Sequence, residues 1–182
     1  MVDIEALATR SRQVADRSRV RMACRVLVVI ASLTCIPLLA GAHRASCVCL
    51  AVALFLTAAV LRWRDRNGIE AVKLGLAFGA IPLLAAVGLR ACGIACAELG
   101  AFSEGELACF AAGAVAGAGV SFVVAHGSQR GQWRLLWTIL VASLTASLGC
   151  VGLGMAGVLS TVVAMLASAT LVWIPVSLRA AP

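Results

Sequence analysis

The chain has 182 residues, of which 62% are hydrophobic and only 13% are charged, and its mean hydropathy is +1.03. Charged residues make up about 25% of an ordinary soluble domain, so this composition excludes a soluble globular protein. The net charge of +7 would suit a nucleic-acid binder, but the arginines flank apolar segments instead of covering a soluble face. We therefore predict one membrane domain whose basic residues contact the lipid bilayer at its anionic headgroups, with no nucleic-acid partner.

Six apolar segments without charged residues follow one another along the chain. Each is close to the ~17–25 residues that a helix rising about 1.5 Å per residue needs to cross hydrocarbon. The sequence thus predicts an all-α membrane protein, a bundle of about six transmembrane helices at residues 26–178, after a basic cytoplasmic arm at residues 1–25. The expected spans are 26–42, 45–61, 74–89, 107–125, 135–149 and 155–177.

The basic residues predict how the chain is oriented, because thirteen of the fifteen lie in breaks on one side of the spans. The positive-inside rule places that side, with both termini, in the cytoplasm of a bacterial inner membrane. All the tryptophans, whose indole rings favour the membrane interface, fall at the same ends of the spans. The thirteen are Arg10, Arg12, Arg17, Arg19, Arg21, Arg25, Arg62, Arg64, Arg66, Lys73, Arg130, Arg134 and Arg179; the predicted interface anchors are Trp63, Trp133, Trp137 and Trp173.

Two features near the N-terminus leave alternatives open. On a helix, Arg12 and Arg19 of the arm lie opposite the other arginines, so the arm is not a clean amphipathic surface helix. It is either a plain basic flank of the first span or a partner-binding arm, with Arg10, Arg12, Arg17, Arg19 and Arg21 as candidate contacts. The first span also fits an apolar signal segment that is cleaved after residues 40–42, although acidic residues precede it and five more spans follow it.

Short patterns within the spans predict helix contacts and starts. Gly75 with Gly79, and Gly113 with Gly117, offer small faces for close packing within the bundle rather than for a dimer seam. Asn67 followed by Glu70 has the spacing of an N-cap and a back-reaching acid at the start of span three. The segment 36–40 is repeated at 81–85, and the segment 31–34 at 142–145, so two or three helical-hairpin repeats are one interpretation. Coincidence in a chain rich in Ala and Leu is the other.

Six of the eight cysteines form a candidate thiol cluster at or near the external side. The periplasm is oxidising, so one or two structural disulfides are the leading interpretation, although six thiols allow 15 pairings. Capture of a soft metal ion is a second interpretation, with His43 near two of the cysteines. Thiol–disulfide exchange is a third, although the chain has no Cys-x-x-Cys pair. The cluster consists of Cys47, Cys49, Cys92, Cys96, Cys109 and Cys150.

The residues that are missing from the spans also restrict the function. No span has an acidic, basic or histidine residue in its middle, which disfavours ion-coupled transport. Only His43 and His126 are present, on opposite sides, so no hydrolase triad or zinc-hydrolase site is expected. We therefore expect no enzymatic activity, no catalytic or cofactor-binding residue, no cofactor and no assigned metal ligand.

The layout resembles the six-span anti-sigma factors of proteobacteria, the NrsF-type family. The matching parts are the arm at residues 1–25, the number of spans, Cys109 and Cys150 at outer ends of spans, and Gly113 and Gly117 after Cys109. The resemblance implies a cytoplasmic arm that holds a regulatory protein such as a sigma factor, and external cysteines that sense stress. The chain departs from the family after Cys150, where an acidic stretch with His or Pro is expected, and its arm lacks a clear sigma-binding motif.

The sequence therefore favours a non-enzymatic, multi-pass inner-membrane protein that acts as a regulator with periplasmic-side cysteines. A membrane handler of soft metal ions or of thiol and disulfide redox is the first alternative. A structural or accessory membrane subunit is the second.

Overall fold

The structure is a computed structural model, and it describes residues 21, 24–39, 41–64, 66–91, 104–126, 132–151 and 154–179. Every regular element in these ranges is helical, so the predicted all-α class is confirmed. A first helix at Cys24–Leu39 precedes the five longer ones. These are α2 (Arg44–Arg64), α3 (Arg66–Ala91), α4 (Glu104–His126), α5 (Gln132–Cys150) and α6 (Met155–Arg179).

The five longer helices are each long and apolar enough to cross a membrane, and the chain is a membrane protein. The helix Cys24–Leu39 is shorter. This helix ends at Leu39, before the end predicted at residue 42. The span predicted at 26–42 therefore ends early, and six crossings remain a prediction.

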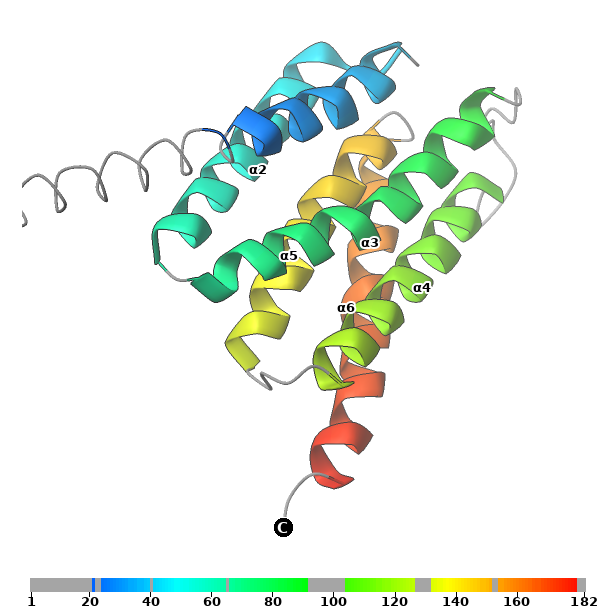
Figure 1. Ribbon diagram of the computed structural model, residues 1–182. Helices are drawn as coiled ribbons and strands as arrows, with labels where there is room; N and C mark the ends of the chain where they lie inside the picture. The colour runs from blue at the N-terminus through cyan, green and yellow to red at the C-terminus, as the bar shows by residue number, and fades with distance from the viewer. Residues whose placement is uncertain are drawn as a thin grey trace, which may run out of the picture.

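The first helix ends where it does because Gly41 takes a positive φ of 80°, which residues with a side chain adopt at a cost. The amide of Gly41 donates to the carbonyl of Leu38 (3.1 Å), and that of Ala42 donates to the carbonyl of Pro37 (3.0 Å). This pair of bonds is the Schellman motif that closes a helix C-terminus. The chain then turns back into α2, and the two helices form a hairpin at one side of the bundle (Figure 1).

Helices α3 and α5 form one closely packed parallel pair. A Cβ atom on Gly75 would lie 2.6 Å from Cβ of Val141, and one on Gly79 would lie 2.6 Å from the carbonyl oxygen of Ala142. The absence of these two side chains therefore brings the backbones together. Since residue numbers rise in step along both helices, the pair is parallel.

Helices α4 and α6 form a second parallel pair and lie side by side in Figure 1. A Cβ on Gly113 would lie 2.7 Å from the carbonyl oxygen of Thr161, and one on Gly117 would collide with the carbonyl oxygen of Met165. Further along, the hydroxyl of Ser121 donates to the carbonyl of Ala169 across the same seam (3.0 Å). Both glycine patterns therefore pack within the bundle, as predicted.

The two pairs pack against each other, chiefly through α3 with α4 and α5 with α6, and α5 is the most enclosed of the five long helices. Its Leu148 and Val141 share a core cluster with Leu54 of α2 and Ile30 of the first helix. On the outer faces of the bundle, large apolar side chains such as Leu140 are exposed. Exposed apolar side chains on helices of this length suit contact with lipid.

The four tryptophans lie toward one end of the bundle, which we call the tryptophan end. Trp63 is exposed in the last turn of α2, next to the start of α3, and Trp133 is exposed in the first turn of α5. Trp137 packs one turn further along α5, and Trp173 of α6 packs beside the C-terminal part of α4. The opposite end, where α5 finishes and α6 begins, is called the thiol end below.

Candidate functional site

Two cysteines from different helices meet at the thiol end. Cys109 lies in the second turn of α4 and Cys150 is the last residue of α5. Their sulfur atoms are 3.5 Å apart, and neither residue has any exposed surface. Both are free thiols. The structure thus brings together two members of the predicted cluster that are 41 positions apart in the sequence.

Thr161 of α6 is the third polar group of the site and is also fully buried. Its hydroxyl donates to the carbonyl of Gly157, one turn earlier on its own helix (2.8 Å). Its Oγ1 also lies 3.2 Å from Sγ of Cys150, whose thiol donates to Sγ of Cys109 at 3.5 Å. We call Cys109, Cys150 and Thr161 the thiol site.

The close packing of the helices places these three side chains together. Gly113 lets α4 approach the backbone of α6 at Thr161, one turn from Cys109. Gly149 meets the backbone of Leu83, where a Cβ would lie 2.6 Å from the Cα atom of Leu83. The end of α5 is therefore held against α3 and beside α4. Ala86 and the partly buried Val158 complete an apolar cluster around the two sulfurs.

The arrangement allows two kinds of thiol chemistry. A disulfide needs its sulfurs at about 2.05 Å, so the pair would have to close from 3.5 Å. Alternatively, two thiolates can bind a soft metal ion. Within the described ranges, no group of three or more His, Cys, Asp or Glu residues is close enough to hold a metal ion. The metal interpretation therefore has only two sulfur ligands to use at this site.

The other predicted cysteines are differently placed. Cys47 is buried in the first turn of α2, whereas Cys49 is exposed two residues later. Cys92 and Cys96 lie outside the described residues. Cys24 and Cys35, which were not included in the cluster, are exposed. The described part of the chain therefore shows a pair of neighbouring thiols at Cys109 and Cys150, and not a single cluster of six.

Most of the predicted partner-binding arm lies outside the described residues, including Arg10, Arg12, Arg17 and Arg19. Arg21 is described and is exposed. The proposed contact of the arm with a partner remains a prediction.

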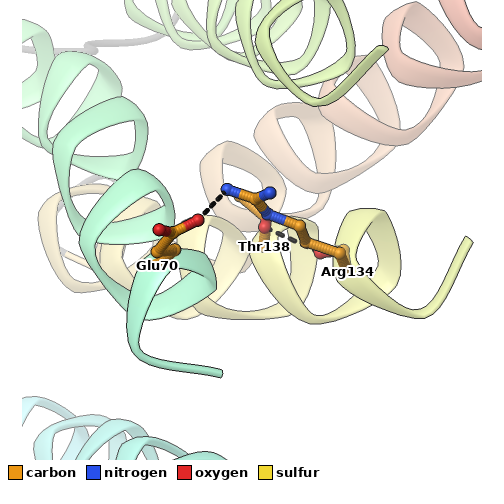
Figure 2. Close-up of polar contacts among 3 residues, drawn as sticks. All are labelled: Glu70, Arg134 and Thr138. Atoms are coloured by element: carbon orange, nitrogen blue, oxygen red, sulfur yellow. Dashed lines mark hydrogen bonds and ion pairs between the residues drawn. The ribbon is translucent and has the colours of Figure 1, made fainter. Parts of the chain in front are cut away.

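At the tryptophan end, an ion pair joins α3 to α5. Nη2 of Arg134 donates to Oε2 of Glu70 at 2.5 Å (Figure 2). Sequence reasoning missed this pair, because it assigned Glu70 to a helix cap and Arg134 to a basic flank. The cap was wrong: α3 begins at Arg66, so Asn67 is already inside the helix. An acid and an arginine at the same end of two neighbouring spans were the available signal.

Comparisons with protein-family models, with curated proteins and with solved structures found no match to this chain.

The contact of Cys109 with Cys150 predicts selective cross-linking. Treatment of the purified, reduced protein with diamide is expected to link these two cysteines, because their sulfurs are already neighbours. Mass spectrometry of a non-reduced digest should find the linked peptide, and the Cys150→Ser variant should lose it. Cys35→Ser is the matched control, since Cys35 is exposed on the first helix, and it should leave the link unchanged. Finding Cys109 and Cys150 still as free thiols after treatment that oxidises Cys35 or Cys49 would contradict the prediction.

Proposed function

We propose that this chain is a non-enzymatic regulator in a bacterial inner membrane, and that it responds to chemical change at the thiol site. The observation that carries the proposal is the contact of two fully buried thiols between α4 and α5. Thr161 of α6 contacts the same pair. A chemical change at these sulfurs therefore acts on the packing of three helices at once, as a sensing element requires.

The charge distribution supports a signal that passes from the periplasmic side of the membrane to the cytoplasmic side. With the basic breaks in the cytoplasm, the thiol end faces the periplasm and the arm at residues 1–25 lies on the opposite side. The periplasm is kept oxidising, so thiols near this face meet oxidants before cytoplasmic groups do. The arm then provides contact with a cytoplasmic regulatory protein such as a sigma factor, in the manner of the anti-sigma family that the layout resembles.

The switching step is formation of a disulfide between the two cysteines. Each thiol loses one proton, one S–S bond forms, and two electrons pass to the oxidant. With diamide as oxidant, the N=N bond accepts both electrons and both protons and becomes the hydrazine. The sulfurs must approach by more than an ångström to reach disulfide length, so α4 and α5 are pulled together at one end. Packed helices respond to such a shift by changing arrangement rather than by gradual deformation.

A transcript comparison tests the proposal in cells that carry the gene. A pulse of diamide should change a defined set of transcripts in the wild type. The same set should fail to respond in strains with Cys109→Ser, Cys150→Ser or a deletion of residues 2–20, while Cys35→Ser should respond normally. Membrane fractions must contain equal amounts of each variant. An identical response in the wild type and both cysteine variants would refute the proposal and favour the accessory-subunit interpretation.

A further inference from the structure

We infer that the thiol site binds a soft divalent cation in two-coordinate form, with mercury(II) as the type ion. Among the described residues, its ligands would be the sulfurs of Cys109 and Cys150. This inference rests on the proposed function, because it names a chemical class to which the same site responds. It concerns binding of an ion and not oxidation, so it can be tested apart from the disulfide switch.

The number of available ligands selects the ion. Zinc in structural sites takes four ligands in a tetrahedron, and calcium and magnesium take six or more oxygens. Among the described residues, no acidic residue or histidine forms a metal-binding group with the two sulfurs. Two thiolates alone complete the coordination of ions that favour a linear S–M–S arrangement, which are mercury(II), copper(I) and silver(I).

The neutral surroundings of the site then distinguish between these ions by the net charge of the bound complex. The side chains clustered on the sulfurs are those of Ala86 and Val158, with the neutral hydroxyl of Thr161. A buried net charge in such an apolar site is unfavourable unless it is paired. Two thiolates with copper(I) or silver(I) carry a net charge of −1, whereas two thiolates with mercury(II) are neutral. The site therefore favours the divalent ion.

The binding step balances without any oxidant. Neutral mercuric chloride exchanges two Hg–Cl bonds for two Hg–S bonds, and two protons and two chloride ions are released. The S–H of Cys150 that donates to Cys109 supplies one of the two protons lost. The sulfurs, now 3.5 Å apart, move away from each other to admit the ion. Binding thus moves the sulfurs in the direction opposite to disulfide formation.

Mercuric chloride titration of the purified, reduced full chain in detergent, with excess glutathione as a competing thiol, tests the inference. The main variant keeps Cys109 and Cys150 and has serine at Cys24, Cys35, Cys47, Cys49, Cys92 and Cys96. It should retain one mercury per chain, with two sulfurs at the metal by X-ray absorption. In a separate titration without glutathione, about two protons should be released per ion. Adding Cys150→Ser to this variant should weaken retention by at least tenfold. Thr57→Val is the matched control; the hydroxyl of Thr57 bonds back to Ala53 within α2, away from the two sulfurs, and this variant should still bind.

A second measurement uses the unmodified chain, in case six substitutions disturb folding. One equivalent of mercury under the same competition should protect Cys109 and Cys150, and no other cysteine, from alkylation. Equal retention by the Cys150→Ser variant, release of a single proton per ion, or protection of other cysteines would overturn the inference. If the chain binds mercury as described but shows no diamide-dependent transcripts, the proposed regulator fails and the ion site stands. If the transcripts respond and no ion is retained, the ion site fails and the regulator stands.

Discussion

Replacing Gly117 by alanine is expected to lower the free energy of unfolding by about 1–3 kcal/mol, the usual cost of adding a methyl group to a filled contact. The new Cβ would overlap the carbonyl oxygen of Met165 and the hydroxyl of Ser168, and its next neighbour would be the Cα atom of Met165 at 2.9 Å. Two of these three atoms belong to the backbone of α6, so a side-chain rotation cannot relieve the overlap. The two helices must move apart. Unfolding of the purified protein in mixed detergent and SDS measures the loss.

A matched control comes from the same fold. Gly88 of α3 is also a helical glycine, but a Cβ there would meet nothing within 4 Å. Gly88→Ala should therefore leave stability unchanged or raise it by up to about 1 kcal/mol, because alanine is the better helix former. Gly79→Ala, which places a Cβ 2.6 Å from the carbonyl oxygen of Ala142, should behave like Gly117→Ala. If Gly117→Ala and Gly88→Ala had the same effect, the close contact of α4 with α6 would be wrong.

These glycines also show how far the sequence could predict the fold. A spacing of four residues places Gly113 and Gly117 on one face of a helix, and that face could be recognised as a contact surface. The spacing does not identify the partner, because any neighbouring helix with small residues satisfies it. The pairing of α3 with α5 and of α4 with α6 is between helices that are not consecutive. It depends on which of several apolar faces fit together best, and a sequence without charged residues in its spans gives little information about that choice.

The first helix illustrates a different limit. Its apolar residues predicted a span at 26–42, yet the helix ends at Leu39 because Gly41 closes it with a Schellman motif. A glycine between apolar segments is visible in the sequence. Whether it ends a helix or is accommodated within one is decided by the hydrogen bonds of the following residues, which hydropathy does not report.

The sequence indicated Cys109 and Cys150 as candidate thiols, but it did not predict that they contact each other. Cys109 and Cys150 could each be placed near the end of a span, as could four other cysteines. Gly113 brings α4 against α6 and Gly149 brings the end of α5 against α3, and the contact between these two cysteines depends on both approaches. The hydroxyl of Thr161 bonds back to its own helix. Its second contact, with Cys150, depends on the pairing of α4 with α6 and so could not be anticipated.

The ion pair at the tryptophan end should respond asymmetrically to substitution. The side chain of Arg134 is only 14% exposed, whereas that of Glu70 is 61% exposed. Glu70→Gln leaves a largely buried guanidinium without its carboxylate. Removing one partner of a fully buried pair costs about 3–5 kcal/mol, and exposed pairs contribute about 0–1 kcal/mol. Since only one of these partners is buried, we expect a loss of about 1–3 kcal/mol.

The reciprocal substitution should cost less. Arg134→Met removes the charge, keeps most of the apolar contact of the side chain and leaves Glu70 as a carboxylate that water can hydrate, so the expected loss is within about 1 kcal/mol. Among the described residues, Nε of Arg134 is buried without a hydrogen-bond partner. Retaining arginine without Glu70 therefore leaves the guanidinium with still fewer hydrogen-bond partners. Replacement of arginine thus removes an unfavourable burial together with the pair.

Unfolding in mixed detergent and SDS of Glu70→Gln, Arg134→Met and the double variant tests this asymmetry as a double-mutant cycle. The double variant should be close to Arg134→Met, because glutamine has no charge to face once arginine is gone. Thr138→Val is the control for local packing on α5; its hydroxyl donates to the carbonyl of Arg134 at 2.7 Å (Figure 2), and its loss should be small. A larger cost for Arg134→Met than for Glu70→Gln would mean that the guanidinium is stabilised mainly by contacts other than Glu70, and the ion pair would then not be what joins α3 to α5 at this end.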